Sequence, residues 1–382
     1  MLSPTREILS PCFRLVCISG CGACGARYSR RTEKIRGTST LVTRKVSACL
    51  QAALCTLVFA ASGIAQEAIS LAGSGSNLVA PLYSAWTSEF AKQHPNVQVT
   101  YLAVGTSQSI KTILAGSGDF GGGELPLTSA QKHDGERPLT QFPTVLVAIA
   151  PIYKLPENPQ LRFSGELLAE IYLGNIKNWK DPRIAKLNPD ISLPNLAITT
   201  VHLSGLKGSN YILTDFLSKT SPEWKSKIGR TASPKWPIGT EINRSQGMVA
   251  KVSATLGSIG YVELTYAKRN DIGYGSVQNE DGEFVRPTVA GILSACTESE
   301  KSLPDDLGGT LVNAAGRDSY PLASFTFIYL PATGLAPPRS RALKDFWTWA
   351  LSDGQEIART LGYAPLPASI AAKSAKAVNS IR

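Results

Sequence analysis

The chain has little cysteine or histidine, and its cysteine is unevenly placed. The sequence of 382 residues holds seven Cys and three His. Six of the Cys lie within residues 1–55, which leaves Cys296 alone in the remainder. A single thiol allows neither an internal disulfide nor a Cys-based metal site, so we expect Cys296 to be buried. Because His94, His133 and His202 are not spaced as metal ligands, we expect no metal site and no cofactor.

Motifs that carry catalytic groups are also missing after residue 65. There is no phosphate-binding Gly-x-x-x-x-Gly-Lys loop, no His-Glu-x-x-His pair and no Cys-x-x-Cys. The stretch GTSQS at 105–109 approaches the Gly-x-Ser-x-Gly elbow of hydrolases but lacks its second glycine. The sequence therefore favours a protein that is not an enzyme.

Only one apolar run is long enough to suggest a targeting segment. Arg44 and Lys45 precede the apolar residues 48–61, and small residues follow as far as Ala65. This order is typical of a secretory signal, and the run is shorter than the ~20 apolar residues of a membrane span. We expect residues 1–65 to be a leader and signal peptide, with the true start after Met1. The protein would then lie in the periplasm or be secreted further.

The excess of positive charge belongs mostly to this leader. The whole chain has 39 Lys and Arg against 29 Asp and Glu, a net charge of +10. Residues 1–65 hold nine of the basic and two of the acidic residues, so residues 66–382 hold 30 and 27, a net charge of +3. A balance so close to neutral does not favour nucleic acid as a partner.

Three short turns rich in glycine and hydroxyl groups stand out after the leader, each followed by a helical pattern. They are GSGSN at 73–77, GTSQS at 105–109 and SGLKGSN at 204–210. The free backbone N–H groups at a helix start, together with hydroxyl or amide side chains, hold a small anion without forming a covalent bond. The three turns therefore predict an anion-binding protein.

Strand and helix patterns alternate along residues 66–382. Strands are expected over 68–72, 97–103, 142–152, 196–203, 260–263 and 325–330. Helices are expected over 80–93, 110–115, 164–173, 211–219, 247–256 and 341–351. This alternation predicts an α/β fold with a mostly parallel sheet. A length of 317 residues suits two lobes, and a cleft between two lobes is a common place for a small ligand.

Several motifs occur in a fixed order along the same region. They include GSGS at 73–76, APLY at 80–83, GDFG at 118–121, IYLGNIKNW at 171–179, KWPIG at 235–239 and GSIGYVE at 257–263. In this order they resemble the PstS family, the phosphate-binding proteins of bacterial ABC transporters. The resemblance implies an α/β, two-lobed periplasmic-binding-protein fold, a type II-like clamshell whose cleft closes on its ligand. It implies one lobe from residues 66–149 and 321–382, and a second from residues 150–320.

The resemblance also implies a ligand, a partner and a set of contacts. The ligand would be phosphate or a similar oxyanion, delivered by a monomeric protein to the membrane subunits of an ABC permease. The implied ligand-binding residues are Asn77, Leu78, Thr106, Glu124, Lys207, Gly208 and Ser209. Glu124 matches the position of a family Asp that accepts the proton of bound hydrogen phosphate, and its side chain is one methylene longer. The longer side chain is expected to crowd the site.

The third turn departs from the family. Leu203 stands where the family has an Arg that pairs with phosphate, and Gly205 stands where it has the Asp that braces this Arg. Lys207 either restores the positive charge, as a point charge and not a bidentate fork, or points to solvent. His202, just before the turn, either has a structural role or supplies a pH-dependent charge. The alternative function is a degenerate PstS-like secreted or surface protein that serves in adhesion or sensing.

Overall fold

The structure is a computed structural model that describes residues 68–133 and 138–381. Contacts join Gln66–Arg382 into one compact unit. The expected leader and signal peptide, residues 1–65, lie outside the described residues. None of the helices in the described ranges is both long enough and apolar enough to cross a bilayer.

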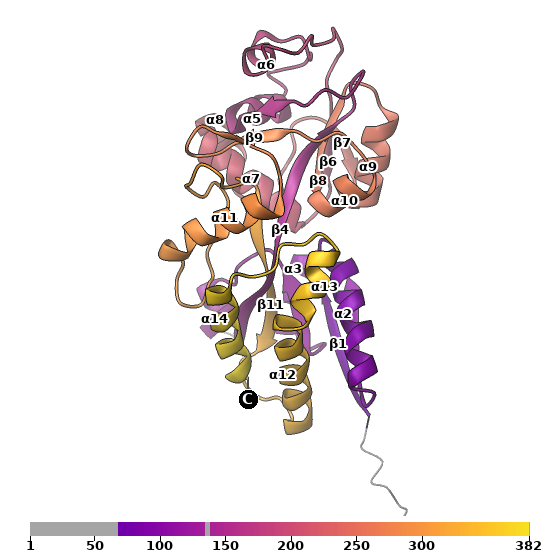
Figure 1. The fold of residues 1–382 in the computed structure, drawn as a ribbon, viewed down its shortest axis with the longest axis vertical. Helices are drawn as coiled ribbons and strands as arrows, with labels where there is room; N and C mark the ends of the chain where they lie inside the picture. Colours follow the sequence, from indigo (N-terminus) through magenta and orange to yellow (C-terminus); the bar gives the residue numbers. More distant parts are fainter. Residues whose placement is uncertain (1–67, 134–137, 382) are drawn as a thin grey trace, which may run out of the picture. The chain divides into compact units, whose positions relative to one another are not determined.

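The strands and helices alternate along the chain, as the sequence predicts (Figure 1). The strands are β1 (Ile69–Gly75), β2 (Val97–Ala103), β3 (Phe120–Gly123), β4 (Leu139–Tyr153), β5 (Arg162–Phe163), β6 (Thr199–Leu203), β7 (Thr240–Ile242), β8 (Ser258–Glu263), β9 (Ser276–Gln278), β10 (Phe284–Val285) and β11 (Ala323–Pro331). The helices are α2 (Ala80–Gln93), α3 (Thr106–Leu114), α4 (Ser129–His133), α5 (Gly165–Leu173), α6 (Pro182–Leu187), α7 (Gly208–Thr220), α8 (Pro222–Lys227), α9 (Ser245–Ala254), α10 (Leu264–Arg269), α11 (Val289–Ser299), α12 (Pro337–Leu351), α13 (Gly354–Thr360) and α14 (Ala368–Asn379), with a 3₁₀ turn at Glu300–Ser302.

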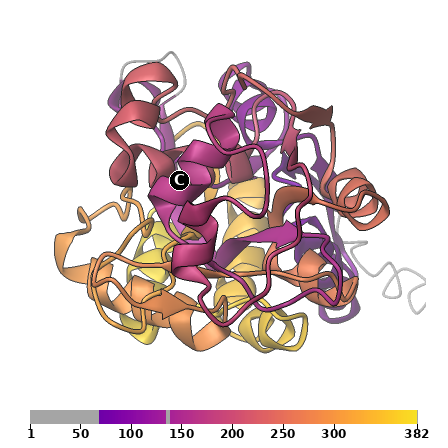
Figure 2. The ribbon, with the colours of Figure 1, turned by 90° about the horizontal axis from the view of Figure 1, so that it is seen from above.

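The long strand β4 joins two groups of strands into one sheet. The order of that sheet is β2-β1-β3-β11-β4-β8-β6-β7. Residues 139–148 of β4 pair with β11, and residues 149–153 pair with β8. We call β1, β2, β3, β11 and the start of β4 the first strand group, and β6, β7, β8 and the end of β4 the second strand group. Helices cover both groups on their two faces (Figures 1 and 2).

The expectation of a mostly parallel sheet holds only for its outer strands. β1 is parallel to β2 and β3, and β6 is parallel to β7 and β8. The centre is antiparallel, because β11 runs against both β3 and β4, and β4 runs against β8. Two parallel halves are therefore joined through antiparallel strands, a feature that alternation of elements alone does not reveal.

Four helices begin earlier than their apolar pattern predicts, among them α3 at Thr106 instead of residue 110 and α12 at Pro337 instead of residue 341. α7 begins at Gly208 and not at residue 211, and α9 begins at Ser245 and not at residue 247. Gly and Ser are poor helix formers, so they fall outside an apolar pattern. They are tolerated in a first turn, where the backbone N–H groups have no partner within the helix. The last residues of the glycine-rich segments at 105–109 and 204–210 therefore belong to the first helical turns of α3 and α7.

The core between α2 and α12 is built from aromatic side chains. Trp86 and Trp347 are fully buried, and so is Cys296, as expected from the sequence. The ring of Tyr83 stacks on Trp86 at 5.1 Å between centroids and meets Trp347 edge-on at 5.8 Å. These contacts hold α2 in place, and with it the first turn of that helix.

An ion pair connects the start of α12 to the residue just before β3, and we expect its loss to lower the stability of the fold. Arg339 Nε donates to Asp119 Oδ1 at 3.0 Å, and the buried Asp119 also accepts from the backbone N–H of Ala72 at 2.7 Å. Because Arg339→Ala would leave this carboxylate without its cation, we expect a loss of about 1 kcal/mol in the free energy of unfolding. Denaturant titration measures it, and Arg339→Lys, which keeps the charge, should lose less. Equal stability of Arg339→Ala and the wild type would contradict the expectation.

Candidate functional site

A small cavity lies where the N-termini of α2, α3, α7 and α9 come together. It is lined by Ser76, Asn77, Leu78, Gly105, Thr106, Leu203, Lys207, Gly208, Ser209, Asn243, Arg244, Ser245 and Glu263. About 10 Å³ is open to the centres of water-sized molecules, the space of about one water. The first strand group supplies α2 and α3, and the second supplies α7 and α9. The three turns singled out in the sequence therefore do meet in one place.

The four helices that begin at this cavity have no side-chain cap. The residues before their first turns are Val79, Gly105, Lys207 and Arg244, and none accepts a side-chain hydrogen bond from its helix. By contrast, α5, α6, α8 and α11 are each capped by a Ser, Asp or Thr side chain. Uncapped ends also occur at α12, α13 and α14, and at the short α10, whose N-cap residue Glu263 lines the same cavity. Four free N-termini at one cavity concentrate N–H donors and partial positive charge, an environment that favours an anion.

Asn210 holds the third turn in shape. Its side-chain amide donates to the carbonyls of Leu203, Gly205 and Ala232 at 3.1, 3.1 and 3.3 Å. Its oxygen accepts from the hydroxyl of Tyr261. The turn before α7 is therefore braced from inside by one buried amide, which positions the first residues of α7 at the cavity.

Glu124 lies directly behind the cavity and joins the two strand groups. The hydroxyl of Thr106 donates to Glu124 Oε2 at 2.9 Å, and Ser76 also bonds the carboxylate. A methyl group built on Gly208 would fall 1.8 Å from the same Oε2. Burial raises the pKa of Glu124 to about 7, although the bonds from Ser76 and Thr106 favour the charged form. The longer side chain expected to crowd the site fits because Gly208 has none.

Two further polar groups at the cavity lack partners. Ser209 is 1% exposed and its hydroxyl has no hydrogen bond within the part of the chain that the structure describes. Glu263 is also buried; Oε1 accepts from Ser245 at 2.8 Å, but Oε2 has no partner there. Burial raises the pKa of Glu263. Buried polar atoms without partners are uncommon, and at a cavity they indicate a missing ligand or water.

Lys207 and Arg244 supply the positive side chains at the cavity. Lys207 is half-buried and Arg244 is exposed. Burial lowers the pKa of Lys207, and the nearby Arg244 lowers it further. Neither side chain takes part in the ion pairs formed between described residues. Two like charges are therefore near each other, and neither is paired with a carboxylate among the described residues.

The structure brings the sequence-predicted site residues together. Asn77, Leu78, Thr106, Lys207, Gly208 and Ser209 line the cavity, and Glu124 touches it from behind. Of the two outcomes left open for Lys207, the structure shows the one in which it lines the cavity. The residues that the sequence analysis missed are Ser76, Asn243, Arg244, Ser245 and Glu263. Three of these precede or begin α9, where no glycine marked the turn.

The role expected for the first glycine-rich turn needs correction. Gly73 and Gly75 belong to strand β1, not to the turn before α2. A methyl group on Gly73 would lie 2.0 Å from the ring of Phe120, and one on Gly75 would lie 2.3 Å from the carbonyl oxygen of Gly122. These glycines therefore allow β1 to pack tightly. The part of the segment that lines the cavity is Ser76–Leu78, where the N–H of Leu78 donates to Ser76 Oγ.

The departures in the third turn are visible in the cavity wall. Leu203 is buried and places an apolar side chain at the cavity. Gly205 is exposed at φ 67°, with open space around it. His202 does not line the cavity; its ring stacks on Trp236 at 5.0 Å and burial lowers its pKa. The structural role is therefore the one that the structure supports for His202.

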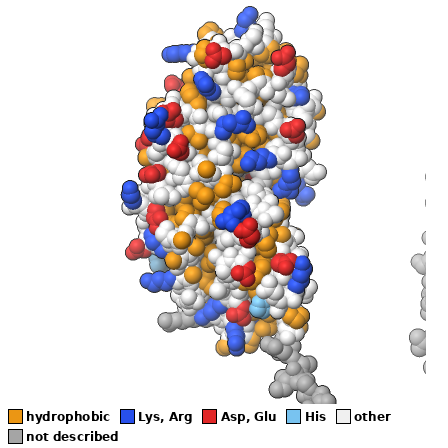
Figure 3. Space-filling model, in the orientation of Figure 1, with side chains coloured by type: hydrophobic (Ala, Val, Ile, Leu, Met, Phe, Trp, Pro, Cys, Tyr) orange, Lys and Arg blue, Asp and Glu red, His pale blue; other side chains and the backbone are white. Residues whose placement is uncertain are grey.

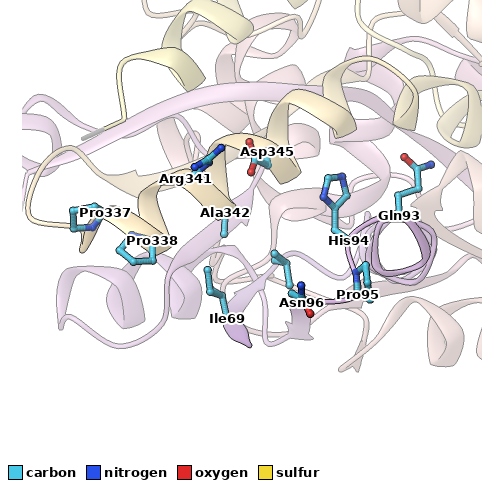
Figure 4. A pocket seen from close by; sticks show the side chains of 11 residues that line it. Ile69, Gln93, His94, Pro95, Asn96, Pro337, Pro338, Arg341, Ala342 and Asp345 are labelled. Atoms are coloured by element: carbon cyan, nitrogen blue, oxygen red, sulfur yellow. The ribbon is translucent and has the colours of Figure 1, made fainter. Parts of the chain in front are cut away.

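A larger hollow of about 640 Å³ lies elsewhere, between the end of α2, the start of β2 and the start of α12 (Figure 4). Arg341 and Asp345 both come from α12, so the hollow has no excess of one charge. His94 stacks on Phe90 at 4.1 Å.

On the face drawn in Figure 3, basic and acidic side chains are interspersed. Within residues 68–133 and 138–381, no three His, Cys, Asp or Glu are placed to hold a metal ion.

Comparison with known proteins agrees with this architecture. A family model described as a PBP superfamily domain matches residues 60–354. Phosphate-binding protein PstS of Pasteurella multocida is 36% identical over 325 residues, which cover 85% of this chain and 94% of that protein. The protein of the same name from Haemophilus influenzae is 36% identical over 308 residues, which cover 80% and 91%.

Solved structures extend the likeness to the fold. The crystal structure of a phosphate binding protein from Stenotrophomonas maltophilia matches with a TM-score of 0.62. It is 16% identical, and the match covers 81% of this chain and 94% of that one. The expected α/β periplasmic-binding-protein fold is thereby confirmed.

Proposed function

Because the chain belongs to the PstS family of phosphate-binding proteins, we propose that it captures inorganic phosphate in the periplasm and delivers it to an ABC importer. The single observation that carries this proposal is the cavity at which four uncapped helix N-termini meet. Such a cavity offers many N–H donors to a tetrahedral oxyanion and no group placed for catalysis. The protein would act by binding alone, without a cofactor and as a monomer.

Each predicted residue has a role in this binding. Backbone N–H groups of Gly208 and Ser209 would donate to phosphate oxygens, with the side chains of Thr106 and Asn77 beside them. The N–H of Leu78 would join them by exchanging its bond to Ser76 Oγ for one to phosphate. Glu124 would accept the proton of hydrogen phosphate, since a carboxylate is acceptor-only when ionised. Sulfate carries no such proton and would meet the ionised Glu124 without a hydrogen bond, a contrast that is fullest above the pKa of Glu124, about 7. The site should therefore favour phosphate over sulfate.

Closure around the ligand would use the two strand groups as lobes. We assign residues 66–149 and 321–382 to one lobe and residues 150–320 to the other, with β4 and the segment before β11 as the connections. The cavity takes α2 and α3 from one and α7 and α9 from the other. A ligand that bonds both sides stabilises the closed arrangement, which a permease can recognise.

Isothermal titration with inorganic phosphate tests the proposal, with sulfate as the control anion. We expect a dissociation constant of micromolar order or tighter and a rise in melting temperature, because a ligand that binds only the folded state stabilises it. Sulfate should bind at least about tenfold more weakly, the loss of one charge-assisted hydrogen bond. The apolar Leu203 favours the alternative, a degenerate surface or sensing protein. Absence of any response to phosphate would support that alternative and overturn the proposal.

A further inference from the structure

This chain lacks the arginine that pairs with phosphate in the family, so another side chain at the cavity would have to supply its positive charge. Leu203 occupies the position of the family Arg, and its buried side chain cannot bond an anion. Yet the residues that line the cavity include another arginine, Arg244, which precedes α9. The chain brings this group from a segment 41 positions further along than Leu203.

We propose that Arg244 is a ligand-binding residue of this site and that, together with Lys207, it holds the tetrahedral oxyanion from the α7 and α9 side. This inference rests on the proposed function and deepens it. Arg244 would supply the positive charge that the family Arg supplies, but from the exposed mouth of the cavity instead of from its interior.

The arrangement of charges supports this role. Burial lowers the pKa of Lys207, and Arg244 lies close enough to lower it further, because like charges repel. No carboxylate pairs with either side chain among the described residues. An anion bound between them would replace this repulsion with two attractions. The pair therefore has an electrostatic cost in the free protein that a bound oxyanion removes.

The surroundings point to the same ligand independently of the two charges. The hydroxyl of Ser209 lines the cavity, is fully buried and has no partner in the described part of the chain. The N-termini of α7 and α9, with 13 and 10 residues, open at the same cavity without side-chain caps. An oxyanion there would accept from the Ser209 hydroxyl and from both helix starts at once.

The test compares Arg244→Gln with the wild type by isothermal titration with inorganic phosphate. We expect the variant to bind about tenfold more weakly, the lower end for a charge-assisted hydrogen bond because Arg244 is exposed. Arg244→Lys keeps the charge and should lose less. Arg341→Gln removes the same charge from an exposed residue of α12 that lies outside the cavity, and should bind phosphate as the wild type does.

The melting temperature of the ligand-free protein separates a binding role from a structural one. Removing Arg244 relieves its repulsion with Lys207, so Arg244→Gln should melt no lower than the wild type before phosphate is added. A variant that loses affinity and ligand-free stability together would mark a structural residue and overturn the inference. Unchanged affinity in Arg244→Gln would overturn it while leaving the proposed function intact. A wild type that binds no phosphate would overturn both.

Discussion

Replacing Gly208 with alanine should weaken phosphate binding by more than about a hundredfold. The new methyl group would lie 1.8 Å from Oε2 and 2.7 Å from Cδ of Glu124, well inside van der Waals contact. Glu124 is buried, so its carboxylate would have to leave Thr106 and turn into a cavity with room for about one water. The displaced carboxylate would repel the anion, and it would no longer accept the hydrogen bond from the proton of hydrogen phosphate. These two charge-dependent effects together give the expected loss of affinity. Titration with phosphate measures the loss.

A second substitution should restore binding in that variant. Glu124→Asp shortens the side chain by one methylene, so Gly208→Ala combined with Glu124→Asp should recover much of the lost affinity. Gly205→Asn is the matched control, since this glycine has open space around it and Asn tolerates its φ of 67°. The explanation would be wrong if the double variant bound no better than Gly208→Ala alone.

Glu124→Gln should stabilise the protein increasingly as the pH rises from about 4.5 to about 7. Burial raises the pKa of Glu124 from 4.5 in an unfolded chain to about 7 in the folded protein. Because the folded state holds this proton to a higher pH than the unfolded state, ionising Glu124 costs stability, and that cost grows across this interval. At pH 7 and above it approaches about 3 kcal/mol, at 1.36 kcal/mol per pKa unit. A neutral amide avoids it.

Denaturant titrations of both proteins at several pH values measure this difference. The wild type and Glu124→Gln should differ little in the free energy of unfolding near pH 4.5 and most above pH 7. Glu166→Gln controls for the loss of one negative charge at an exposed residue of α5. Glu124→Gln should also lose the preference for phosphate over sulfate, since an amide does not distinguish a proton-bearing oxyanion. A stability difference that stays constant across the interval would refute the buried-carboxylate account.

The fold was predictable because its local signals are strong. The apolar side chains of residues 80–93 recur at helical spacing, and the structure begins and ends α2 at these residues. The strand predicted over residues 142–152 lies within β4, whose side chains are almost all buried. The helix predicted over residues 164–173 also forms, and its N-cap Ser164 accepts from the N–H of Leu167 at 3.1 Å. Each of these features depends on neighbours a few positions apart.

The site was predictable only where glycine marked it. Thr106 and Ser209 were predicted because they lie in glycine-rich turns that match positions of the family. Arg244 and Ser245 begin a helix as well, but no glycine-rich signature draws attention to them. Conversely, Gly73 and Gly75 were predicted to belong to an anion-binding turn, but they make room for close packing in β1. A glycine in the sequence indicates that a larger side chain would not fit at that position. The sequence does not identify the neighbouring group with which that side chain would clash.

The sequence by itself determined the α/β class, the more strongly patterned helices and strands, the family and the three turns that reach the cavity, because these follow from periodicity and from ordered motifs. Only the tertiary structure decided that Arg244 stands at the cavity from which the family Arg has been lost, and that Gly208 makes room for the longer Glu124. The physical reason is distance along the chain: Glu124 and Gly208 are 84 positions apart. Their contact exists because β4 joins two parallel groups of strands through an antiparallel centre, which brings the starts of α2, α3, α7 and α9 to one point.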